Sequence, residues 1–212
     1  MKKVLLIILS SLVTIIATPQ KSATELNKEQ KNKAIKQARK EAKRMEKEGW
    51  YVAPGSIPLS EVLENALMKQ VIVDDSGSVK YIYADGNAVA ETKSAAEMQA
   101  IELGKLQLAG LIQTNISSLV SANIGNSQLS TQEAASVTEV VQSAKNIIAV
   151  ELGYIDPTLK IFKKVGKDKV EVQVRLFYET RQSLVIAKKA VRKELKGKLK
   201  LNEEKLDKII GI

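Results

Sequence analysis

The strongest constraint on the fold is an alternating segment near the carboxyl end, Lys169 to Glu179. Every second residue is apolar, and the set is Val170, Val172, Val174, Leu176 and Tyr178. Glu171, Gln173, Arg175 and Glu179 are polar and belong to the other face, together with Phe177. This period of two predicts a strand with one buried face, while the other face meets solvent or a partner. Residues 158–165 precede it, with Gly166-Lys167-Asp168 between, so the two segments predict a hairpin. We expect Phe162 and Phe177 on the polar side.

Two long helical segments should cover the buried face of this hairpin. Residues 93–121 carry the small residues Ala96, Ala100 and Gly104 at spacings of four, which would allow close approach of another helix inside the domain. The alternative is a dimer interface formed by the same small residues. Residues 131–150 form the second helix, opened by a Ser130-x-x-Glu133 capping box.

A further strand is expected at residues 79–90, with a kink or bulge at Asp85-Gly86-Asn87. The predicted class is therefore α+β, with an antiparallel sheet of about three strands (79–90, 158–165 and 169–179) covered on one face by two long helices. Shorter elements complete the chain, and each follows from local signals. They are a helix at 60–70 capped by Ser60, a turn at Asp74-Asp75-Ser76-Gly77, and helices at 180–196 and 201–212.

The first nineteen residues have the form of a secretory signal peptide. Lys2 and Lys3 precede an apolar run from Val4 to Ala17, of about 14 residues where a spanning helix needs roughly 20. We expect cleavage near Ala17-Thr18 and no transmembrane span afterwards. The alternative is an uncleaved amino-terminal anchor. Export would place the protein in the periplasm or outside the cell, with association with the outer membrane left open.

A charged helix is expected from residue 22 to 48, with Ser22 and Glu25 as a capping box and Gly49 after its end. Between Lys21 and Glu48 there are ten Lys or Arg and five Glu, a net +5, out of a net +7 for the chain without Lys2 and Lys3. Its apolar stripe is thin, so we expect a solvated spacer or a helix lying loosely on the domain. The functional alternative is a basic arm that touches an anionic surface. Trp50, the only tryptophan, is expected to anchor the core or the edge of the domain, with a ligand platform as the alternative.

The residue types present exclude several classes of catalysis. The chain has neither Cys nor His, which leaves no Ser-His-Asp or Cys-His nucleophile system and no zinc site of the usual ligands. It also leaves no disulfide and no cysteine for lipidation. We expect no catalytic residue, no metal and no cofactor. A carboxylate-based hydrolase stays an alternative, with acids drawn from Asp74, Asp75, Asp85, Asp156 or helical glutamates, although no spacing sets a pair.

The middle of the chain resembles the small envelope proteins of the Lpp-twenty lipoprotein type, over near half of the mature chain. The matching features are a strand with a small glycine turn, an alanine-rich helix with a following Leu-Ala step, and an alternating last strand. They lie at Asp85-Gly86, at Ala96, Ala100 and Gly104, at Leu108-Ala109 and at Val170 to Tyr178. The wider chain is similar to uncharacterised exported proteins of Gram-negative gut bacteria. The resemblance implies an envelope-associated protein, in some members tied to motility or adhesion, without a catalytic site.

These observations predict four parts: a signal peptide (1–19), a basic helical segment (20–49), an α+β core domain (50–180) and carboxy-terminal helices (181–212). The predicted function is an exported, non-enzymatic structural or interaction protein of the cell envelope. Its partners would be envelope proteins, an anionic envelope surface or a second copy of the chain, with no role in nucleic-acid binding. A binding module for an anionic glycan or lipid is the alternative, and an envelope-polymer hydrolase is the second.

Overall fold

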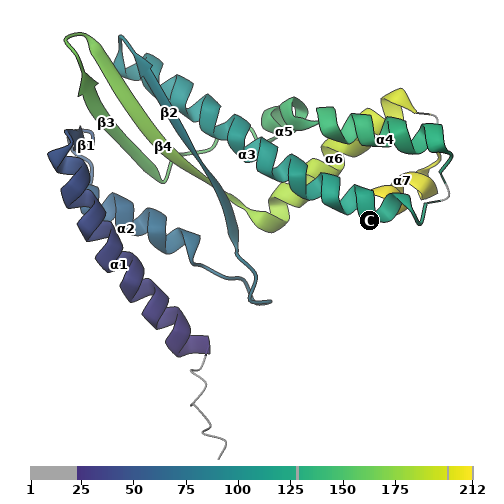
Figure 1. The fold of residues 1–212 in the computed structure, drawn as a ribbon, viewed down its shortest axis with the longest axis horizontal. Helices are drawn as coiled ribbons and strands as arrows, with labels where there is room; N and C mark the ends of the chain where they lie inside the picture. Colours follow the sequence, from purple (N-terminus) through teal and green to yellow (C-terminus); the bar gives the residue numbers. More distant parts are fainter. Residues whose placement is uncertain (1–22, 128, 200, 212) are drawn as a thin grey trace, which may run out of the picture.

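The computed structural model describes residues 23–127, 129–199 and 201–211, and it confirms the α+β class (Figure 1). The helices are α1 (Ala23–Lys47), α2 (Leu59–Gln70), α3 (Lys93–Ile124), α4 (Thr131–Ser143), α5 (Lys145–Glu151), α6 (Thr180–Lys198) and α7 (Glu203–Ile210). The strands are β1 (Trp50–Tyr51), β2 (Tyr81–Ala90), β3 (Leu159–Val165) and β4 (Lys169–Glu179). The predicted signal peptide and Ser22 lie outside the described residues.

The sheet is antiparallel, with the strand order β1-β3-β4-β2. The three predicted strands are confirmed, and β1 is a short fourth strand beside β3. The kink or bulge expected at Asp85-Gly86-Asn87 is wrong, because β2 and β4 pair residue by residue from Tyr81 opposite Glu179 to Ala90 opposite Val170. The absence of a side chain at Gly86 instead allows α3 to approach the strand closely.

Helix α3 covers one face of the sheet and touches the backbone of β2. A Cβ atom on Gly86 would lie 1.9 Å from the carbonyl oxygen of Ala100, and one on Gly104 would lie 3.1 Å from Leu176 Cδ1 and 3.3 Å from the Gly86 nitrogen. The small residues of α3 therefore allow close approach, but of a strand and not of another helix. Since Ala96, Ala100 and Gly104 are buried against the sheet, the dimer interface considered for them is also wrong.

The carboxyl half of α3 leaves the sheet and joins a helical bundle with α4, α5, α6 and α7 (Figure 1). Its 32 residues span about 48 Å, whereas the ten residues of β2 span about 33 Å, so the helix outruns the strands. The expectation that the 131–150 segment covers the sheet is wrong for this reason: α4 packs on α3 and α6. That segment is also two helices, divided at Ala144. The Ser130–Glu133 capping box is confirmed.

The other face of the sheet is partly covered by α1 and α2, which form a second hydrophobic core with Trp50, Leu159, Ile161 and Phe177. The expected solvated or loosely laid helix is therefore wrong for the described part of α1. Its alanines and one methionine interlock with α2, and they are Ala34, Ala38, Ala42 and Met45. Short side chains let two helices approach closely, so a thin apolar stripe suffices. Trp50 is confirmed as a core residue.

Phe177 lies on the α1–α2 face as expected, but Phe162 lies on the α3 face, with Lys93 Nζ 3.9 Å from its ring centre.

Ser60 does not cap α2, because that helix begins at Leu59 and the carbonyl of Pro58 accepts from the N–H groups of Glu61 and Val62. The turn at Asp74 is confirmed: its carboxylate accepts from the backbone N–H groups of Ser76 and Ser78. No helix among the described residues is long and apolar enough to cross a membrane.

Candidate interface for an anionic surface on α1

Two stripes run along opposite sides of α1. The buried stripe consists of Ala34, Ala38, Ala42 and Met45, and the basic stripe consists of Lys36, Lys40, Lys43 and Lys47. Each set follows spacings of three and four residues, which place its members on one side of a helix. At 100° per residue the two sets lie on opposite sides. Packing on α2 therefore directs the basic stripe to solvent, and the stripe spans about 16 Å of the helix.

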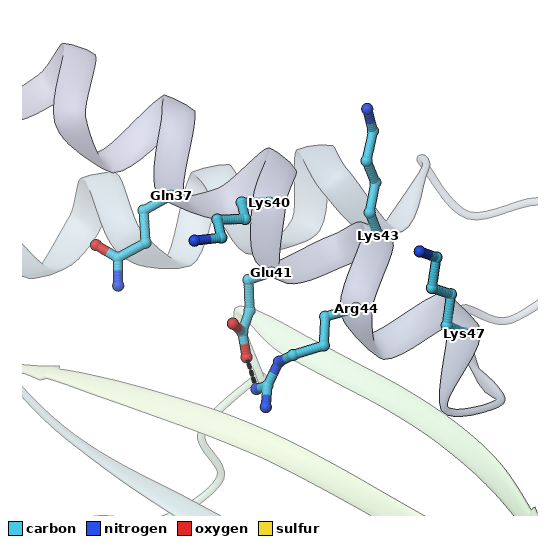
Figure 2. A pocket seen from close by; sticks show the side chains of 6 residues that line it. All are labelled: Gln37, Lys40, Glu41, Lys43, Arg44 and Lys47. Carbon is cyan, nitrogen blue, oxygen red and sulfur yellow. Dashed lines mark hydrogen bonds and ion pairs between the residues drawn. The ribbon is translucent and has the colours of Figure 1, made fainter.

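Most carboxylates near the stripe already have partners on the helix. Glu41 accepts a hydrogen bond from Arg44 (Figure 2), and Lys33 Nζ lies 3.2 Å from Glu29 Oε1. The Glu41 carboxylate raises the pKa of Arg44 through that hydrogen bond. In the described part of the chain, no carboxylate lies within 4 Å of the ammonium groups of the basic stripe. Their charges are therefore available to an external anion.

Six residues of α1 line an open hollow: Gln37, Lys40, Glu41, Lys43, Arg44 and Lys47 (Figure 2). Figure 2 shows the side chains of Lys43 and Lys47 extending away from the Glu41–Arg44 pair. All six residues come from one helix, so within the described part of the chain the hollow has no opposing wall that could enclose a small molecule. A row of cations of this kind suits an extended anionic surface better than a single small ligand.

The acids considered for hydrolysis lie on separate elements. Asp74 and Asp75 are in the turn before β2, Asp85 is in β2, and Asp156 precedes β3, where its carboxylate is 3.3 Å from the Tyr154 hydroxyl. Ser76 donates to Asp74 through its hydroxyl, which lowers the pKa of this carboxyl group. Among the described residues, no three or more Cys, His, Asp or Glu side chains are grouped so that they could hold a metal ion.

One polar cluster was not predicted. On the face of the sheet opposite α3, Arg175 donates to both carboxylate oxygens of Asp85, over 2.6 and 2.8 Å, and its guanidinium lies 5.2 Å from the ring centre of Tyr83. This contact raises the pKa of Arg175. Beside it, Asn87 donates to Glu171 over 2.8 Å. The partners are about ninety positions apart in sequence and meet only through the β2–β4 register, so no local signal identifies them.

Comparisons with known proteins found no matching family model, no matching curated protein and no matching solved structure. The resemblance to the Lpp-twenty type therefore stays a hypothesis based on the residues given above.

Proposed function

We propose that this chain is an exported, non-enzymatic protein that associates with an anionic surface of the cell envelope through the basic stripe of α1. The observation that carries the proposal is the two-sided pattern of this helix. One side is fixed in the second hydrophobic core, and the other presents four exposed lysines that form no ion pair with a carboxylate in the described part of the chain. The Lpp-twenty resemblance supports an envelope role but adds no residue to the interface.

Phosphate-bearing lipid headgroups are the surface that fits the stripe. A basic residue close to an anionic membrane contributes about 1 kcal/mol of binding free energy, and the four lysines lie on one side of α1. The stripe lies along the helix axis, so all four could approach a surface at once. A helix fixed to a folded domain also loses less conformational entropy on binding than a free basic tail would.

Export is tested by the amino terminus of the natural protein. We expect the chain recovered from the periplasm or the medium to begin at or next to Thr18, because the charged and apolar segments end at Ala17. Amino-terminal sequencing of the purified protein is the measurement. A chain that still begins at Met1 and sediments with the membrane fraction would overturn the cleavage prediction.

Surface binding is tested with the mature chain and vesicles of phosphatidylglycerol and phosphatidylcholine. We expect co-sedimentation at low salt and its loss near 1 M salt, where charges are screened over about 3 Å. Replacing Lys36, Lys40, Lys43 and Lys47 with glutamine should weaken binding by roughly 100- to 1000-fold, since about 4 kcal/mol is removed.

The matched control changes the same net charge on other exposed surfaces: Lys167, Lys169, Lys189 and Lys193 are replaced with glutamine. This variant should bind nearly as well as the unchanged chain. Equal weakening by both variants would show that only total charge matters, and the stripe would then not be the interface. Binding to phosphatidylcholine alone would also contradict the proposal.

A further inference from the structure

The two edges of the sheet differ greatly in length. At one edge stands β1, which has two residues, and at the other stands β2, which has ten. In the described part of the chain no strand pairs with the outer side of β2. A long open edge presents a row of unpaired backbone donors and acceptors that can pair with another strand.

The hydrogen-bond pattern identifies the residues that carry the open groups. The carbonyl of Arg175 accepts from the N–H of Thr158, the residue before β3. The carbonyl of Lys80, the residue before β2, accepts from the N–H of Thr180, the residue after β4. Backbone groups alternate in direction along a strand, so the even-numbered residues of β2 pair with β4. The N–H and C=O groups of the odd-numbered residues therefore face the open edge, and these residues are Tyr81, Tyr83, Asp85, Asn87 and Val89.

This edge lacks the features that usually block strand pairing. β2 contains neither Pro nor Lys, and its one charged residue, Asp85, already binds Arg175. Tyr83 and Val89 are large side chains with 40% and 46% of their surface exposed. Natural edge strands are commonly protected by charge, proline or a bulge.

An exposed stripe of α3 runs beside the same edge. Gln107, Leu111 and Thr114 line an open hollow with Tyr83 and Asp85 of β2, and Leu103 stands one turn before Gln107 on the same side of the helix. Leu103 and Leu111 are 44% and 47% exposed. The edge and the stripe together form a surface with both backbone and apolar groups available.

We infer that a second copy of this chain occupies this surface, with β2 pairing antiparallel to β2 of the copy about a twofold axis at Gly86. In this register Tyr83 lies opposite Val89 of the copy, and Asp85 lies opposite Asn87. The first is an aromatic–β-branched pair and the second allows a hydrogen bond. A shift by two residues in one direction would place Asp85 opposite Asp85, which is unfavourable. A shift by two in the other direction would place Asp85 opposite Val89 and Asn87 opposite Asn87. The register about Gly86 is therefore the one of the three that gives both complementary pairs.

The helices agree with this arrangement. Because α3 contacts both β2 and β4, we place the axis of this helix midway between the two strands. Neighbouring strands are about 4.8 Å apart, so the helix axis lies about 5 Å from the twofold axis. The α3 helices of the two copies would then be about 10 Å apart, close to the 8–10 Å of packed helices. Leu103 would meet the α3 helix of the copy. The dimer leaves the basic stripe of α1 uncovered, so it does not depend on the proposed function.

The test measures the mass of the mature chain by sedimentation equilibrium over a range of concentrations. We expect twice the mass of one chain. Asn87→Pro removes an outward N–H without touching the ladder with β4, and Asn87→Ala keeps that N–H. Leu103→Glu places charges in the helix contact, whereas Met98→Glu changes a 69% exposed residue away from the stripe. The proline and Leu103→Glu variants should be monomers, and their two controls should stay dimers.

The register is tested by cross-linking, because the natural chain has no cysteine. With Tyr83→Cys and Val89→Cys in one chain, mild oxidation should give a covalent dimer; Tyr83→Cys with Asn87→Cys should give much less. Circular dichroism checks that each variant is folded. If the Asn87→Pro variant does not fold, the mass of the Leu103→Glu variant decides the test. A wild-type monomer at the highest concentration reached, or a dimer unaffected by Leu103→Glu, would overturn the inference.

Discussion

Replacement of Gly86 with alanine is expected to give the largest loss of stability of any single substitution considered for this chain. The new Cβ would lie 1.9 Å from the Ala100 carbonyl oxygen and 2.6 Å from the Gly104 nitrogen. Both are backbone atoms in the first half of α3, so no side chain can rotate away. The helix would have to move off the sheet. We expect a cost at or above the upper end of the range of about 1–3 kcal/mol for overpacked cores.

Gly197→Ala is the matched control, because a Cβ at this α6 position meets nothing within 4 Å. Gly197 is the next-to-last residue of α6 and is exposed, so the same chemical change there should alter stability by no more than about 0.5 kcal/mol. Urea unfolding followed by circular dichroism measures both. If Gly86→Ala unfolds at the same urea concentration as the unchanged chain, the close contact between β2 and α3 is not present in solution.

The parts of the fold that sequence predicts well are those whose signals are local. The β3–β4 hairpin follows from a period of two and a glycine turn, and β4 has the expected bounds. The capping box at Ser130 likewise needs only residues within one turn. Such signals say which face of an element is apolar, but they do not say which element covers it.

The errors concern partners that are distant in sequence. Ala100 and Gly104 indicate that another element approaches α3 closely, but the same small residues would be needed whether that element is a helix or a strand. Gly86 is the residue of β2 that contacts them. In the sequence alone, this glycine indicates a kink or bulge in the strand. The candidate site shows the same difference. The basic residues of α1 can be recognised from the composition of residues 21–48, whereas the ion pair between Asp85 and Arg175 can be found only when the register of β2 and β4 is known.

Removal of α1 is the second change with a large expected effect. A mature chain that starts at Gly49 loses Ala38 and Ala42, which are 0% and 1% exposed, together with Met45, and it uncovers Leu63 and Trp50. Burial of a methionine alone contributes about 1.5–3 kcal/mol. We therefore expect a loss of about 3 kcal/mol or more, a large part of the roughly 5–15 kcal/mol that keeps a domain folded. Urea unfolding of the truncated chain measures it.

The same truncation also removes the basic stripe, so loss of vesicle binding by this chain would not separate a folding role of α1 from a binding role. The variant with glutamine at Lys36, Lys40, Lys43 and Lys47 separates them. It keeps the buried stripe, and changes at exposed positions usually alter stability by no more than about 0.5 kcal/mol. It should unfold at the same urea concentration as the unchanged chain, and its binding to anionic vesicles should be strongly weakened. If the truncated chain is as stable as the full mature chain, α1 is an appendage and its buried contacts with α2 contribute nothing measurable. If the glutamine variant is strongly destabilised, the lysines act in folding and not in surface recognition.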